Sequence, residues 1–96
     1  MVATYYIGEI EINPNDNPDV ETEQAKYNSL VVKIGITRAL TVAELAISPV
    51  GVELTVSIMD GAITLIYTGT VDELISRNGY SQIEIKNVTL TIETGD

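Results

Sequence analysis

The feature that most constrains the fold of this 96-residue chain is an Asp60-Gly61 pair between two runs of alternating apolar residues. Asp-Gly in this setting is the strongest short-range signal for a β-hairpin, because both residues of the favoured turn need a positive φ. A two-residue turn there pairs Ile58 with Ile63, and the next pairs along the hairpin are also apolar. The sequence therefore predicts a half-buried antiparallel hairpin.

Three further segments alternate in the same way and predict strands over residues 4–12, 27–36 and 80–94. In the first of them, Tyr6, Ile10 and Ile12 fall on one face, and Ile7 falls on the opposite face with the charges. The last segment changes phase after Ile85, which predicts a β-bulge at residues 86–87 within one long, bent strand.

Two segments carry the chemistry of a helix start. In residues 41–48 and again in residues 70–78, a Thr precedes a Glu by three positions, as in a capping box. We therefore expect a mainly β fold, bordering on α+β: a small antiparallel β-sandwich or open barrel with one or two short helices. The alternative is a ferredoxin-like β-α-β-β-α-β arrangement after an N-terminal strand.

We expect residues 1–96 to form a single domain with a polar loop at 13–25. Oxygen-bearing side chains at alternate positions of this loop could ligate a cation, as in a calcium loop. The EF-hand pattern fails, because Pro18 and Gln24 stand where Gly and an acid are needed. A solvated connector is therefore the preferred interpretation. The candidate metal ligands are Asn15, Asn17, Asp19 and Glu21.

The chain has no His and no Cys, which removes the side chains that most often serve as general bases, thiol nucleophiles and zinc ligands. Its glycines form no GxGxxG or GKS/T phosphate-binding pattern. We therefore expect no enzyme activity, no catalytic residue and no cofactor.

The formal net charge of −9 argues against binding to nucleic acid or to anionic membrane surfaces, because both need clusters of Lys and Arg. No stretch approaches the roughly 20 apolar residues that span a bilayer. The first residues lack the basic and apolar regions of a signal peptide. We expect the protein in a cytoplasm or within a particle assembled there.

The leading functional hypothesis is a structural, assembly or protein-interaction module that self-associates; an accessory protein of a phage or another particle would be one example. Tyrosines and apolar residues on faces assigned to solvent are the interface candidates. They are Tyr5, Ile7, Tyr27, Val31, Ile66 and Tyr80. One alternative is an acidic inhibitor or nucleic-acid mimic that occupies a basic groove of a partner protein. The other is a cation-dependent binding module that uses residues 13–23.

Overall fold

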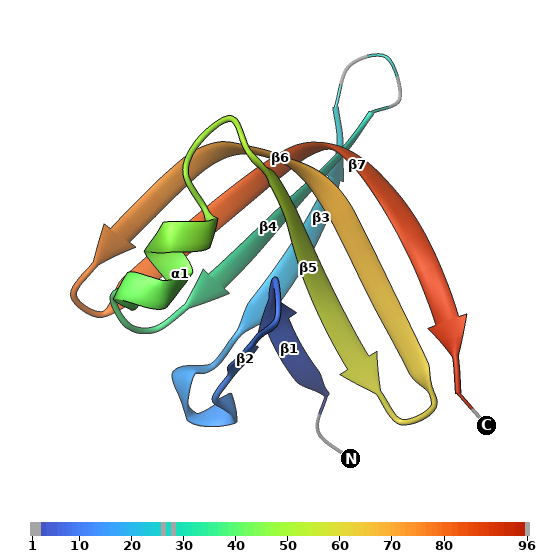
Figure 1. Cartoon of the computed structure of the whole chain (residues 1–96), viewed down its shortest axis with the longest axis horizontal. Helices are drawn as coiled ribbons and strands as arrows, with labels where there is room; N and C mark the ends of the chain where they lie inside the picture. The colour runs from blue at the N-terminus through green and yellow to red at the C-terminus, as the bar shows by residue number, and fades with distance from the viewer. Residues whose placement is uncertain (1–2, 26, 28, 96) are drawn as a thin grey trace.

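A computed structural model describes residues 3–25, 27 and 29–95 of the chain. These residues form one open, antiparallel sheet of seven strands in the order β2-β1-β5-β6-β7-β4-β3, with one short α-helix (Figure 1). The expected mainly β, antiparallel architecture is thus confirmed. The elements are β1 (Thr4–Ile7), β2 (Ile10–Ile12), the 3₁₀ turn η1 (Pro14–Asp16), β3 (Asp19–Gln24), β4 (Leu30–Ile36), α1 (Val42–Ile47), β5 (Glu53–Asp60), β6 (Ile63–Arg77) and β7 (Tyr80–Thr94).

The long strands β6 and β7 arch together across the molecule and give the sheet two arms (Figure 1). In the first arm, residues 63–70 of β6 lie between β5 and residues 88–94 of β7, and β1 and β2 continue the sheet beyond β5. In the second arm, residues 80–86 of β7 lie between the remainder of β6 and β4, and β3 pairs with β4.

Two β-bulges mark the bend between the arms. On β7, Asn87 and Val88 together face the single residue Gly69, and Asn87 has a left-handed backbone with φ 54°. On β6, Asp72 is the extra residue between the pairs Val71–Ile85 and Glu73–Glu84. The expected bulge within one long, bent strand is confirmed, but it comprises residues 87–88 rather than 86–87, because Lys86 pairs with Thr70. A bulge bends its strand and increases the local twist, so these two allow β6 and β7 to pass from one arm to the other.

The core lies between the facing sides of the two arms. Both arms contribute to a single cluster of buried apolar side chains, which consists of Ile7, Ile12, Val32, Ile34, Ile36, Leu40, Leu54, Val56, Tyr67, Val71, Ile83 and Ile85. The phase change in the last strand explains how Ile85 and Leu90 come to face the same side, although their positions differ in parity. The core is aliphatic because the chain has no Phe and no Trp.

The predicted hairpin is present as β5 and β6, but its turn lies one residue later than expected. Asp60 pairs with Ile63, so the turn residues are Gly61 and Ala62, and Ile58 faces Leu65 rather than Ile63. Gly61 has a φ of 61°, as the first position of a II′ turn requires. Moving the register by two residues keeps the same side chains on each face, so apolar alternation alone does not distinguish the two registers.

The helix expected over 70–78 is wrong, because this segment is the second half of β6. In the sequence, Val71, Leu74 and Ile75 are spaced as on one face of a helix, but in β6 Val71 and Leu74 lie on one side of the sheet and Ile75 on the other. The strand ends in a hairpin whose turn is Asn78-Gly79, itself a strong hairpin signal. With one α-helix in the described part of the chain, the ferredoxin-like alternative is also wrong.

The predicted helix at 41–48 is confirmed as α1 with its capping box. The backbone N–H of Glu44 donates to Thr41 Oγ1 (3.1 Å), and the backbone N–H of Thr41 donates to Glu44 Oε1 (2.9 Å). No helix in the described residues is long and apolar enough to cross a membrane.

The N-terminal segment differs from the single strand expected over 4–12. The chain reverses at Gly8-Glu9, and β1 and β2 form a tight hairpin in which Ile7 pairs with Ile10. This reversal resets the alternation, so both Ile7 and Ile12 point into the core. The prediction that Ile7 is an exposed interface residue is therefore wrong.

The segment predicted as a polar loop at 13–25 contains the η1 turn and the edge strand β3. Sequence alternation did not reveal β3 because all its residues except Val20 are exposed, so it lacks an apolar face. The strand predicted over 27–36 begins at Leu30. Tyr27 precedes that strand.

Candidate interaction surfaces

The outer edge of residues 88–94 of β7, called here the β7 edge, is the most distinctive surface of the described chain. β4 pairs with β7 only as far as Ile85, and beyond the bulge β7 pairs with β6 alone. In Figure 1 this half of β7 descends to the C-terminus at the margin of the sheet, with no strand outside it. Its outward N–H and C=O groups therefore have no backbone partner among the described residues.

The β7 edge is apolar and carries little charge. Leu90 and Ile92 are 41% and 59% exposed, and Ile63 on the adjacent strand is 49% exposed. All three lie on the side of the sheet that forms the core further along, because Leu90 pairs with the buried Tyr67. Glu93 is the only charged residue in the segment. Natural proteins usually protect such edges with charges, proline or a covering segment.

The other edges of the sheet are protected in these ways. Residues 71–77 of β6 are partly covered, because Val71 exchanges backbone hydrogen bonds with Gly51 and Val52, and Ser76 Oγ accepts from the N–H of Leu40. β2 has only three residues. β3 presents three acidic side chains at alternate positions, at Asp19, Glu21 and Glu23.

A second surface, called here the acidic face, lies on the outer side of the second arm. One cross-strand row runs from Glu21 through Lys33 and Glu84 to Glu73. Asp19, Glu23 and Asp72 add acidic groups to this row, and Lys86 adds a base. Lys33 pairs with Glu23 (3.3 Å) and Glu84 (3.6 Å), and Lys86 pairs with Asp72 (3.0 Å).

The acidic face perturbs the ionisation of its members. Burial raises the pKa of the Glu84 carboxyl, and the neighbouring Asp72 and Glu73 raise it further against the opposing charge of Lys33. Hydrogen bonding to Lys86 lowers the pKa of Asp72, and hydrogen bonding to Glu23 raises the pKa of Lys33. The face remains acidic overall because carboxylates outnumber the two lysines.

The structure does not bring the six predicted interface residues together. Tyr5 is half-buried and packs against the core, and Ile7 is fully buried. Val31 and Ile66 are half-buried on the outer sides of opposite arms. Tyr27 is exposed before β4, and Tyr80 extends over Gly35. The residues at the β7 edge were not among the candidates, although they lie within the alternating segment predicted as a strand over 80–94.

No group of three or more acidic side chains among the described residues is arranged to hold a metal ion. The four candidate ligands are dispersed along η1 and β3. Asn17 lies just after η1, and its side-chain amide donates to Thr37 Oγ1 (3.3 Å), while Asp19 and Glu21 lie along the exposed β3.

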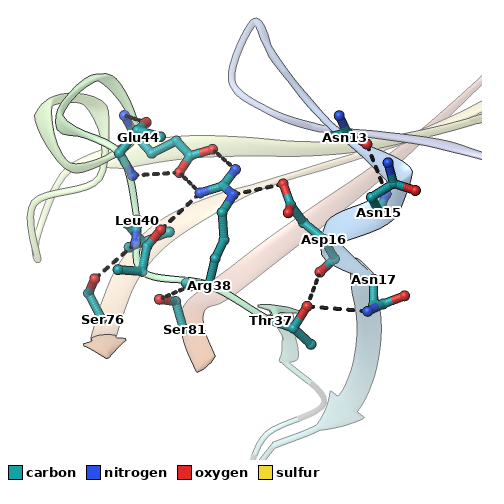
Figure 2. A network of polar contacts seen from close by, with 12 residues as sticks. Asn13, Asn15, Asp16, Asn17, Thr37, Arg38, Leu40, Glu44, Ser76 and Ser81 are labelled. Atoms are coloured by element: carbon teal, nitrogen blue, oxygen red, sulfur yellow. Dashed lines mark hydrogen bonds and ion pairs between the residues drawn. The ribbon is translucent and has the colours of Figure 1, made fainter. Parts of the chain in front are cut away.

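The most tightly bonded polar cluster surrounds Arg38 (Figure 2). Arg38 Nη1 and Nη2 donate to the two carboxylate oxygens of Glu44 at 2.7 and 2.8 Å, and Nε donates to Asp16 Oδ2 at 2.8 Å. The carboxylate of Glu44 is almost completely buried, and Ser81 Oγ donates to the carbonyl of Arg38 (2.6 Å). Perturbed pKa values can mark active sites. In this cluster the perturbed pKa values are those of Arg38 and Glu44, which already bond to each other. The cluster is therefore structural, and it ties α1 and η1 to β7.

This cluster predicts a specific pH dependence of stability. Hydrogen bonding to Arg38 holds the pKa of Glu44 below 4.5, its usual value, despite the opposing effect of burial. A depressed carboxyl pKa stabilises the fold above the unfolded-state pKa, and this contribution is lost as the pH falls through the folded-state pKa. We expect the difference in unfolding free energy between the wild type and Glu44→Gln to be constant near neutral pH and to shrink below about pH 4.5.

Urea denaturation of both proteins from pH 7 to pH 3 measures this difference. Comparing the two proteins removes the effect of the other carboxylates, including Glu84, whose raised pKa acts in the opposite direction. A difference that stays constant down to pH 3 would contradict the assigned role of Glu44.

Comparison of the chain with models of protein families, with curated proteins and with solved structures gives no match.

Proposed function

We propose that this chain is a non-enzymatic structural or assembly module that acts through self-association at the β7 edge. One observation carries the proposal: a strand edge with no backbone partner among the described residues, which exposes Leu90 and Ile92 and has Glu93 as its only charge. An exposed apolar strand edge is a template for pairing with another chain. A location in a cytoplasm, or in a particle assembled there, belongs to the same proposal.

The charge of the chain makes a clear prediction for how salt affects this contact. Two chains of net charge −9 repel each other, and salt screens exposed charges beyond about 3 Å at 1 M. An apolar contact between two such chains should therefore persist or strengthen in high salt. We expect light scattering on a sizing column to give a defined multiple of 10.4 kDa at both low and high salt.

Substitution of Ile92 by lysine tests where the contact lies. Because Ile92 is largely exposed in the single chain, Ile92→Lys should fold normally and yet elute as a monomer, since it places a charge in the apolar contact. Val50→Lys is the matched control, because Val50 has a similar exposure of 63% and lies in the loop after α1. It should keep the wild-type mass.

Two results would contradict the proposal. One is a wild-type protein that stays monomeric at every concentration and salt tested. The other is dissociation of Val50→Lys while Ile92→Lys keeps the wild-type mass, which would place the contact at the exposed apolar residues around α1. Circular dichroism and thermal unfolding establish that each variant is folded before its mass is interpreted.

A second candidate function is supported by the acidic face. Six carboxylates and two lysines on one side of the second arm suit a basic groove of a partner protein. Such binding would weaken steeply with salt, in contrast to an apolar contact. A monomer at both salts would favour this function over self-association, and a basic protein surface would then be the partner to seek.

A further inference from the structure

We propose that two copies of the chain join by antiparallel pairing of their β7 edges about a two-fold axis that passes beside Thr91. This inference rests on the proposed self-association and adds its partner, geometry and register. The two sheets would become one continuous sheet across the axis.

The backbone of the β7 edge has N–H and C=O groups that a second strand can pair. In an antiparallel strand, successive residues direct their N–H and C=O groups alternately to one side and to the other. Residues 88–94 use one side to pair with β6, and the other side meets no described strand. A second strand would satisfy these groups along the whole segment.

The distribution of charge identifies a second copy as the partner. Antiparallel pairing about Thr91 places Leu90 opposite Ile92 of the second copy, and Ile92 opposite its Leu90. Thr89 then faces Glu93 of the second copy, so the only acidic residue of each segment lies across from a neutral hydroxyl. The same kind of pairing between two β3 strands would bring acidic side chains into one narrow row, because Asp19, Glu21 and Glu23 alternate along that edge.

The length of the extended segment selects the register. The segment is bounded by the bulge at Asn87, where φ is 54°, and by the end of β7 at Thr94. Pairing about Thr91 uses the segment from Val88 to Thr94 in both copies. Pairing about Leu90 instead places the bulge opposite Glu93, and pairing about Ile92 leaves Val88 without an opposite residue in β7.

This register also joins the apolar faces of the two copies. Within one copy, Ile58, Leu65 and Ile92 form a cross-strand row. Across the axis the row continues into Leu90 of the second copy and its Tyr67, which reduces the exposure of Leu90 and Ile92. An isologous contact uses the same edge of both copies, so the β7 edge is consumed and the assembly closes as a dimer.

Single-cysteine variants test the register directly, because the chain has no cysteine of its own. Opposite Cα atoms in an antiparallel pair are about 4.5–5.5 Å apart, within the range of about 4.4–6.8 Å that a disulfide needs. Thr91→Cys would face itself across the axis. We expect mild oxidation of dilute protein to shift Thr91→Cys from the monomer band to the dimer band on a non-reducing gel.

Two exposed threonines provide matched controls. Thr89 lies on the same strand and face as Thr91, but its copies would be about 13 Å apart at four residues of separation. Thr22 lies at the middle of β3, the opposite edge of the sheet. Both Thr89→Cys and Thr22→Cys should remain monomeric on the gel under the same oxidation.

The outcomes separate this inference from the proposed function. Cross-linking confined to Thr91→Cys supports the two-fold pairing. A dimer by light scattering in which Thr91→Cys does not cross-link would overturn the pairing and leave self-association standing. A cross-link that forms only when Thr91→Cys and Thr22→Cys are mixed, and in neither variant alone, would also overturn it, in favour of head-to-tail pairing of β7 with β3. A wild-type monomer would overturn both proposals.

Discussion

Replacing Arg38 by methionine should lower the free energy of unfolding by about 3–5 kcal/mol, the usual cost of removing one partner of a buried ion pair. The guanidinium is the bidentate partner of the Glu44 carboxylate, which is only 1% exposed. Methionine would remove both of these donors and leave that carboxylate bonded to the backbone N–H of Thr41. Urea denaturation measures the loss as a lower midpoint with an unchanged slope.

Lys33→Met is the matched control for this experiment. The side chains of Lys33 and Arg38 are 26% and 27% exposed, but the partners of Lys33 are far more accessible to water than Glu44 is. An exposed ion pair contributes about 0–1 kcal/mol, so Lys33→Met should cost little. Adding Glu44→Gln to Arg38→Met should restore part of the stability, because no buried charge then lacks a partner. Equal losses in the two methionine variants would contradict this account.

The second large effect is expected at Gly69, where Gly69→Ala should cost about 1–3 kcal/mol through overpacking. A Cβ atom added to Gly69 would lie 2.6 Å from the carbonyl oxygen of Lys86 and 2.8 Å from Val88 Cγ2. The carbonyl belongs to the backbone of the bulged strand, so it cannot move away without disturbing the bend. Thermal unfolding of the variant measures the effect.

Gly35→Ala is the comparison for Gly69→Ala, because Gly35 also lies within a strand. The nearest atoms to an added Cβ at Gly35 belong to the ring and hydroxyl of Tyr80, at 3.1 Å and beyond. That side chain is 47% exposed at the residue level and can shift toward solvent. The melting temperature should fall clearly more for Gly69→Ala than for Gly35→Ala. The reverse order would mean that the bend tolerates a side chain.

Much of the fold follows from local patterns, and the exceptions have identifiable causes. Alternation predicted the strand over 27–36, in which Val32, Ile34 and Ile36 are buried, and the capping chemistry predicted α1. The same chemistry gave a wrong prediction at 70–78, where Thr70 and Glu73 pair with residues of β7 as part of β6. Ile7 was placed on the wrong face because the reversal at Gly8-Glu9 interrupts an alternation that otherwise reads as one strand.

The candidate interface depends on information that no local pattern contains. Leu90 and Ile92 have the alternation of core residues, and whether such residues are covered depends on where the neighbouring strand stops. Here β4 pairs with β7 only up to Ile85, so the rest of β7 lies at the edge of the sheet. Alternation in the sequence indicates which face of a strand is apolar, but it does not indicate whether that strand lies at the edge of its sheet.

The sharing of β6 and β7 between the two arms has a consequence for how the protein unfolds. The arms resemble two small sheets that face each other, but each depends on the same pair of strands. Neither arm can lose its strands without removing the pairing partners of the other, and the core residues of both form one cluster. We therefore expect the two arms to unfold together as a single cooperative unit, rather than one arm at a time.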